Sequence, residues 1–266
     1  MRSELLKWMA TIKIAIVNQL AYKLNFVLFI IGPSLVYFLI KVNLWKAIFA
    51  TPDLAIEGYT VSTMLSYQGW VLIVSLLAQS FNSMNLAEDI RLGRISSYLV
   101  YPYDFWRYHA ARFLGGLVIQ LFVTGLTAGA LVYGGIVTIT AWDSFILGIL
   151  TCLIVAQIWF VICFIIGIMA FWLEETWVFR VMFLTLAQFF SGALIPIELF
   201  PQWMTQFLLY TPFPYLTYLT AKVFTGDAPI SILQAWGALA IWFLLLCLFA
   251  RWLWGRGIRL YTAAGM

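Results

Sequence analysis

The sequence predicts an all-α integral membrane protein, and three features carry that prediction. Only 10% of the 266 residues are charged, whereas a soluble domain carries about 25%, so too little polar surface exists to cover a water-soluble globule. Apolar runs of roughly 20 residues recur, the length of a helix that crosses about 30 Å of hydrocarbon. The 13 tryptophans suit a protein with two membrane interfaces, where amphipathic rings collect. We expect residues 1–266 to form one transmembrane domain.

Residues 3–20 predict an amphipathic helix that lies flat on the membrane surface. Apolar residues recur on one face at helical spacing, and polar residues fall opposite them. The apolar face consists of Leu5, Met9, Ile12, Ile16 and Leu20, and the opposite face carries Lys7, Thr11 and Asn18. The alternative is that this helix packs on other parts of the protein.

Six transmembrane helices are expected after this segment. Their ranges are 24–40, 59–82, 108–133, 144–172, 178–195 and 232–254. The first is short and contains Pro33, a residue that can kink a helix. The fourth and fifth are separated only by a tight turn at Glu174 and Glu175.

The basic residues predict which side of the membrane each loop occupies. With the N-terminus inside, twelve of the 15 Lys and Arg residues fall on inner segments, and only Lys41, Lys46 and Lys222 fall outside. Positively charged loops stay cytoplasmic. We therefore expect both chain ends and the loop of residues 83–107 to be cytoplasmic.

Residues 196–231 form an apolar outer segment that prolines interrupt. Pro196 and Pro201 mark the corner where it begins. A helix over residues 202–210 is too short to span the bilayer, and irregular backbone that faces lipid is not tolerated. We expect a broken helix that re-enters the outer leaflet and either packs on protein or lies at the interface.

A polar stripe follows one face of the second predicted span, and a shorter one lies on the fifth. The residues are Gln68, Ser75, Gln79 and Asn82 on the second span, and Thr185, Gln188 and Gly192 on the fifth. Polar groups are costly against lipid, so both stripes should face protein or water. They either hydrogen-bond helices together or line a substrate path, and the two roles can coexist at a subunit interface.

The sequence EDIRLGRISSYLVYP, residues 88–102, is a charged interruption between apolar runs. Glu88 and Asp89 end the preceding helix, Gly93 permits a turn, and a short helix can follow over residues 95–100. These features predict a compact amphipathic plug with charges at its base. The turn at Glu174 and Glu175 forms a second inner corner.

No motif for catalysis, metal binding or nucleotide binding stands in the sequence. The three cysteines lack metal-ligand spacing, His109 is the single histidine, and no GxxxxGK[ST] sequence occurs. We expect no catalytic residue, metal or other cofactor on this chain, so any ATP must be bound by another polypeptide. The net charge of +4 comes from scattered residues and does not indicate a nucleic-acid partner.

The chain resembles the permease subunits of type-2 ABC transporters, which are mostly exporters. The order of parts carries the resemblance over nearly the whole chain, and two stretches resemble a bacterial subgroup. These are DIRLGRISSYLVYPYDF at the inner loop and SGALIPIELFPQW at the outer corner. Leu99, Val100 and Tyr101 depart from relatives that often carry a basic residue before Pro102.

The resemblance implies that the inner loop is a coupling helix that docks on a nucleotide-binding subunit, where ATP and Mg²⁺ bind. The N-terminal helix would touch that subunit too. The implied docking residues are Glu88, Asp89, Arg91, Gly93, Arg94, Tyr98 and Pro102, with Glu174 and Glu175 at a second contact. A second permease, homologous or identical, would pair through the second and fifth spans.

The expected function is that of a permease subunit of an ATP-driven exporter in the bacterial cytoplasmic membrane, surrounded by lipid. Its path, aromatic and largely uncharged, suggests an amphipathic substrate such as a lipid-linked molecule, a glycan, a hydrophobic peptide or a drug. Two alternatives remain: a passive channel or lipid scramblase, and a membrane interaction subunit without transport of its own.

Overall fold

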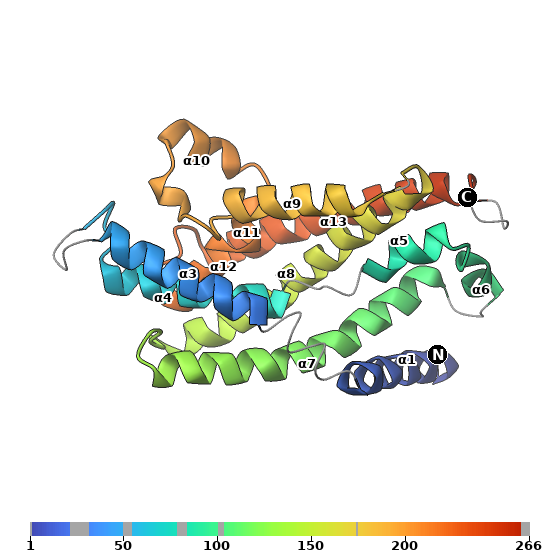
Figure 1. Cartoon of the computed structure of the whole chain (residues 1–266), viewed down its shortest axis with the longest axis horizontal. Helices are drawn as coiled ribbons and strands as arrows, with labels where there is room; N and C mark the ends of the chain where they lie inside the picture. Colours follow the sequence, from blue (N-terminus) through green and yellow to red (C-terminus); the bar gives the residue numbers. More distant parts are fainter. Residues whose placement is uncertain are drawn as a thin grey trace.

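The computed structural model describes residues 2–21, 32–49, 55–78, 84–100, 104–173 and 175–261, and within these ranges the regular elements are helices. Figure 1 shows a long molecule whose helices run mostly along its length. The longer helices are α1 (Arg2–Ala21), α3 (Gly32–Ile48), α4 (Val61–Ala78), α7 (Phe105–Tyr133), α8 (Trp142–Ile168), α9 (Trp177–Phe190) and α13 (Ile232–Gly257). The shorter ones are α5 (Met84–Arg91), α6 (Ile95–Val100), η2 (Met169–Phe171), η3 (Ile197–Leu199), α10 (Gln202–Leu208), α11 (Phe213–Leu216) and α12 (Tyr218–Thr225).

Four helices in the described ranges are long and apolar enough to cross a membrane: α4, α7, α8 with η2, and α13. The fifth predicted span appears as the 14-residue apolar helix α9. The first predicted span, 24–40, lies partly outside the described residues, and α3 continues past its expected end to Ile48. The count of six spans therefore remains a prediction.

Side-chain chemistry explains where two of the spans begin. The Asp104 carboxylate accepts a hydrogen bond from the backbone N–H of Trp106 and caps α7, so this helix starts three residues before the predicted range. Ser231 and Gln234 form a capping box at the start of α13, where the sequence predicts the sixth span. Pro33 is the second residue of α3 within its described bounds, and the kink expected there remains a prediction.

Helix α8 lies at the centre of the packing and contacts α4, α5, α12 and α13. Helix α3 packs on α4 at one end of the molecule (Figure 1). Helices α1, α5 and α6 and the end of α13 gather at the opposite end (Figure 1). The outer segment contains more helix than the sequence predicts, because α11 and α12 follow α10, and α12 packs against both α8 and α4.

Helix α1 packs on the part of α7 nearest α5 and α6, and the contact is closest at Gly115. A Cβ atom at position 115 would lie 2.7 Å from Ala15 Cβ, so the two backbones cross tightly there. The face toward α7 combines parts of both predicted faces, because Ile12 and Ile16 are half-buried together with Lys7 and Thr11, while Leu5, Met9 and Leu20 are exposed. The contact with α7 thus covers part of the polar face and part of the apolar face.

Candidate functional site

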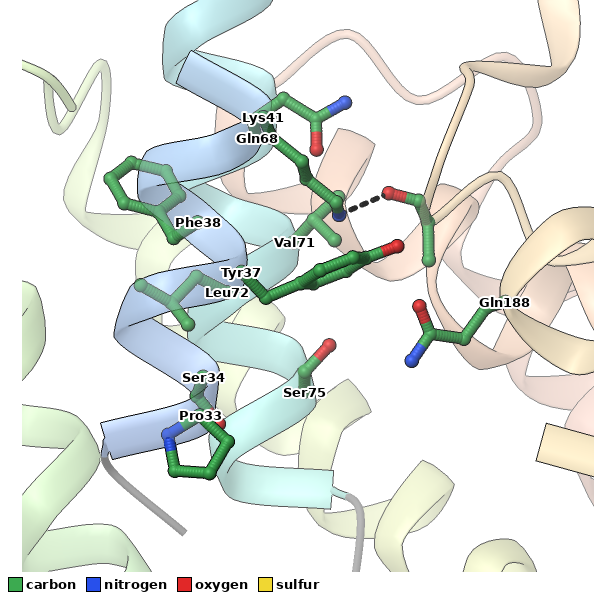
Figure 2. A pocket seen from close by; sticks show the side chains of 11 residues that line it. Pro33, Ser34, Tyr37, Phe38, Lys41, Gln68, Val71, Leu72, Ser75 and Gln188 are labelled. Atoms are coloured by element: carbon green, nitrogen blue, oxygen red, sulfur yellow. Dashed lines mark hydrogen bonds between the residues drawn. The ribbon is translucent and has the colours of Figure 1, made fainter. Parts of the chain in front are cut away.

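Three of the predicted polar-stripe residues line one cavity of about 240 Å³ between α3, α4 and α9. Figure 2 shows Ser75 and Gln188 extending into it from α4 and α9, with Gln68 further along α4. The Gln68 side chain is fully buried, and its Oε1 atom has no hydrogen-bond partner among the described residues. The structure therefore brings the stripes of the second and fifth predicted spans together.

The other stripe residues lie elsewhere. Thr185 is exposed, and its hydroxyl donates to the Val181 carbonyl of its own helix turn. Gly192 lies in the turn after α9 with φ of +78°, a left-handed conformation that favours glycine. Gln79 and Asn82 lie outside the described residues.

Lys41 also lines this cavity, although the sequence did not predict it as a site residue. Because the apolar run ends at Ile40, the sequence placed Lys41 on the outer flank of the first span. Helix α3 instead continues through it, and Lys41 is 4% exposed. Its Nζ atom donates to the Ala193 carbonyl at 2.6 Å and lies 4.7 Å from the centroid of the Tyr37 ring.

Three consecutive carbonyls after α9 accept hydrogen bonds from α3 and α4. The Tyr67 hydroxyl donates to Gly192 at 2.7 Å, Lys41 to Ala193, and Gln68 Nε2 to Leu194 at 3.4 Å. These carbonyls follow the end of the helix, and a backbone carbonyl in a packed turn needs a hydrogen-bond donor from outside the turn. These side chains therefore tie the end of α9 to α3 and α4 beside the cavity.

A second polar cluster, centred on Glu198 in η3, joins three segments: the chain just before α4, η3 and α12. The Glu198 carboxylate accepts hydrogen bonds from Tyr218 at 2.6 Å and Tyr59 at 3.1 Å, and pairs with Lys222 at 2.9 Å. The predicted corner residues Pro196 and Pro201 flank η3. Glu198, Tyr59 and Lys222 also line a cavity of about 480 Å³.

The cluster predicts a loss of stability at alkaline pH. Burial, and then the Glu198 carboxylate, raise the pKa of the Tyr59 hydroxyl above its ordinary value of 10.0. Below that value Tyr59 is protonated whether the chain is folded or unfolded; above it only the unfolded chain ionises, so stability falls as pH rises. We expect the melting temperature to fall above about pH 10, and less steeply for Tyr59→Phe. Thermal unfolding from pH 8 to 11 checks this, with the exposed Tyr210→Phe as a control that keeps the wild-type slope.

The predicted inner plug is a helical hairpin formed by α5 and α6, and buried polar contacts hold it in place. Asp89 is 5% exposed, and its carboxylate accepts a hydrogen bond from the Tyr98 hydroxyl at 3.0 Å and pairs with Arg94 at 3.4 Å. Gly93 turns the chain with φ of +67°. Its carbonyl accepts hydrogen bonds from the Ser96 hydroxyl and from the Tyr261 hydroxyl beyond α13.

The two inner corners that the sequence predicts meet in the structure. Arg91 on α5 pairs with Glu175 at 3.1 Å, which joins the hairpin to the turn between α8 and α9. Glu88 lies 3.7 Å from Arg94. From α5, Leu86 packs so closely on α8 that a Cβ atom at Gly167 would lie 2.7 Å from Leu86 Cδ2. Pro102 and Glu174 lie outside the described residues.

Within the described ranges, no group of three or more His, Cys, Asp or Glu side chains could hold a metal ion. Cys152 and Cys163 are buried, and Cys247 is half-buried. His109 lies among the aromatic rings of Tyr98, Phe105 and Tyr108.

Comparison with known proteins agrees with the geometry. A family model described as ABC-2 family transporter protein matches residues 35–265, a range that contains α4 to α13, the hairpin and most of the residues that line the cavity. Comparison with curated proteins finds no match. The family match confirms the resemblance drawn from the inner-loop and outer-corner sequences. The chain belongs to the ABC-2 transporter family, whose members are the membrane components of transporters and typically work with an ATPase subunit.

Proposed function

We propose that this chain is the permease subunit of an ATP-driven exporter, and that the α5–α6 hairpin is where a separate nucleotide-binding subunit docks. That subunit would bind ATP and Mg²⁺, and the permease would move an amphipathic substrate, such as a lipid-like molecule, glycan or peptide, outward. The observation that carries the proposal is that the tip of the hairpin is charged and exposed, whereas its base is buried against other helices.

The exposed tip offers docking chemistry. Leu92 is 53% exposed between Arg91 and Arg94, an apolar side chain flanked by two guanidinium groups. Solvent-exposed ion pairs such as Arg91–Glu175 contribute only about 0–1 kcal/mol. The arginines can therefore leave these ion pairs at little cost in free energy and pair with carboxylates of a docking partner instead.

The buried base offers a route for force. Leu86 packs against α8, Tyr261 beyond α13 binds the hairpin turn, and Arg91 reaches the start of the α9 segment through Glu175. A displacement of the hairpin by its partner would move the inner ends of these helices together. Because α9 ends beside the cavity of Lys41 and Gln188, movement of α9 would change the shape of that cavity.

The polar cavity and the face of α9 support pairing with a second, homologous or identical permease chain. Of the residues of α9, Ala187 is the buried one, whereas most of α4 is buried within this chain. A partner chain would therefore cover the exposed apolar side chains of α9, with the cavity edge on α4 and α9 nearby. The substrate path would lie between the two chains.

The expected orientation rests on the distribution of charge. Helix α1, the hairpin and the end of α13 lie at one end of the molecule (Figure 1), and this end holds Arg91, Arg94, Arg256 and Arg259. Basic residues favour the cytoplasmic side. We place this end in the cytoplasm of a bacterial cell and the Glu198 cluster at the outer face of the inner membrane.

The charge-reversed variant Arg91→Glu/Arg94→Glu tests docking. We expect it to lower permease-stimulated ATPase activity of the reconstituted complex by about tenfold or more, because truncating or reversing charged interface pairs costs about 2–5 kcal/mol. Insertion should change little, since both side chains are exposed, whereas the melting temperature should fall, because a carboxylate at position 94 would lie beside the buried Asp89; activity is therefore compared for folded protein. Stimulated ATPase activity is measured in proteoliposomes that contain the co-purified nucleotide-binding subunit.

The matched control is Arg256→Glu/Arg259→Glu, which removes the same charge from the same end of the molecule. It should keep most of the stimulated activity. Equal loss in both variants would indicate a general charge effect and contradict the docking role. Substrate or lipid flux through the chain without any nucleotide would instead favour a passive channel or scramblase, and the absence of any co-purifying ATPase would favour a non-transporting membrane subunit.

A further inference from the structure

We propose that the cavity between α3, α4 and α9 binds the anionic headgroup of an amphipathic molecule, with the Lys41 ammonium as its counter-charge. The inference rests on the proposed transport function and adds the charge of the group that the cavity accepts.

Lys41 is buried and has no opposite charge beside it among the described residues. An ammonium group has three hydrogen-bond donors, and the described contacts of Lys41 Nζ are one neutral carbonyl, Ala193, and the face of the Tyr37 ring. Among the described residues no carboxylate lies within 4.0 Å of this nitrogen. A buried charge is stabilised chiefly by an opposite charge and by hydrogen bonds, so an anion in the cavity would supply what the chain does not.

Uncharged polar side chains also line the cavity. Ser75 and Gln188 extend into the cavity from the other two helices (Figure 2), and Gln68 Oε1 is buried there without a hydrogen-bond partner. The Ser75 hydroxyl and the Gln188 amide N–H groups can donate to the oxygens of a phosphate or carboxylate, whereas Gln68 Oε1 can only accept, from a hydroxyl of the headgroup. The polar groups thus converge around the single cation.

The cavity has the size of a headgroup and an apolar wall. The volume of about 240 Å³ is below the roughly 300–1,000 Å³ of pockets for drug-sized ligands. Such a cavity holds a headgroup rather than a whole amphipathic molecule. The wall of Phe38, Val71 and Leu72 is apolar, and the outward side of α3 carries exposed Val36, Leu39 and Ile40, against which an acyl or polyprenyl chain can lie.

A purely structural role for Lys41 makes a different prediction. If Lys41 only ties Ala193 to α3, its replacement lowers stability and leaves ligand preference unchanged. If it is a counter-charge, its replacement removes the preference for anionic over neutral headgroups. Lys41→Gln separates the two roles, because glutamine keeps a donor for the Ala193 carbonyl and removes the charge.

The experiment measures binding of octyl phosphate, octyl glucoside and inorganic phosphate to the full chain in phosphatidylcholine nanodiscs by microscale thermophoresis. We expect the wild type to prefer octyl phosphate over octyl glucoside by about tenfold or more, the factor that one charge-assisted hydrogen bond supplies. Lys41→Arg should keep that preference, and Lys41→Gln should lose it. Lys46→Gln, on an exposed position of the same helix, should match the wild type.

Equal binding of octyl phosphate and octyl glucoside by the wild type would overturn the proposal without any variant. Binding of inorganic phosphate as tight as that of octyl phosphate would overturn the amphipathic part, since the site would then take a free anion. An unchanged preference in folded Lys41→Gln would assign the lysine a structural role only. These binding measurements need no ATPase. The headgroup proposal can therefore be contradicted while the docking role of the hairpin stands, and the docking role can be contradicted while the headgroup proposal stands.

Discussion

Substituting valine for Gly167 is expected to lower permease-stimulated ATPase activity by about tenfold, because it forces α5 away from α8. A Cβ atom at this position would lie 2.7 Å from Leu86 Cδ2 and 3.0 Å from Leu86 Cβ. Overpacking a tight contact costs about 1–3 kcal/mol, and 1.4 kcal/mol is a factor of ten in the population of the packed hairpin. The docking residues at the tip remain unchanged, so the loss would report on transmission and not on binding of the partner.

The measurement compares stimulated ATPase activity with co-purification of the nucleotide-binding subunit. Gly167→Val should retain the subunit and lose stimulation, and the added substitution Leu86→Ala should restore part of it by making room. Gly237→Val is the matched control, because it makes the same change in a helix where a Cβ atom meets nothing within 4 Å. Full stimulation in Gly167→Val would contradict a mechanical role for the contact between α5 and α8.

Removing the Glu198 carboxylate is expected to cause the largest loss of stability. Glu198→Ala leaves the hydroxyls of Tyr59 and Tyr218, which are 7% and 4% exposed, without their acceptor, and leaves Lys222 without its ion-pair partner. Each buried donor left unsatisfied costs about 1–3 kcal/mol. For a chain of this length, each kcal/mol corresponds to roughly 2–4 °C, so the melting temperature should fall by several degrees.

Two glutamine variants separate geometry from charge at this cluster. Glu198→Gln keeps an acceptor oxygen and should lose less stability than Glu198→Ala. Glu57→Gln removes the same charge from the lining of the same cavity, but Glu57 is exposed, and its melting temperature should stay at the wild-type value. Thermal unfolding in nanodiscs measures all three, and a Glu198→Ala variant as stable as the wild type would show that the three segments are held by apolar packing alone.

Much of the fold follows from local pattern. Apolar runs locate α4, α7, α8 and α13 to within a few residues, because a helix that crosses hydrocarbon must satisfy its backbone hydrogen bonds internally. The hairpin around Gly93 is also local, since a glycine in the left-handed region and two short helices lie within 17 residues of chain. The 196–231 segment was predicted least completely, because α12 is stabilised by packing on α4 and α8, and α11 by packing on α12, α9 and α13, and not by periodicity.

Part of the candidate site was also readable from spacing. Gln68 and Ser75 are seven residues apart, so they lie on one helix face, and the sequence predicts that this face meets protein or water. That Gln188 shares their cavity is a long-range fact, since 113 residues separate it from Ser75. The pairing of Arg91 with Glu175 is also long-range, across 84 residues of chain, and the sequence indicated two corners without indicating that they meet.

The sequence by itself determined that this is a helical membrane protein of the ABC-2 type, because composition, apolar length and two short motifs are properties of the chain and need no partner surface. Only the tertiary structure decided that Lys41 is buried and that Glu198 joins three segments. The physical reason is that the burial and pairing of a charge depend on which distant segments surround it. The chain segment after α9 is bonded to α3, and η3 lies against Tyr59 and α12, so an apparent flank residue and an apparent loop residue each become the charged member of a polar cluster.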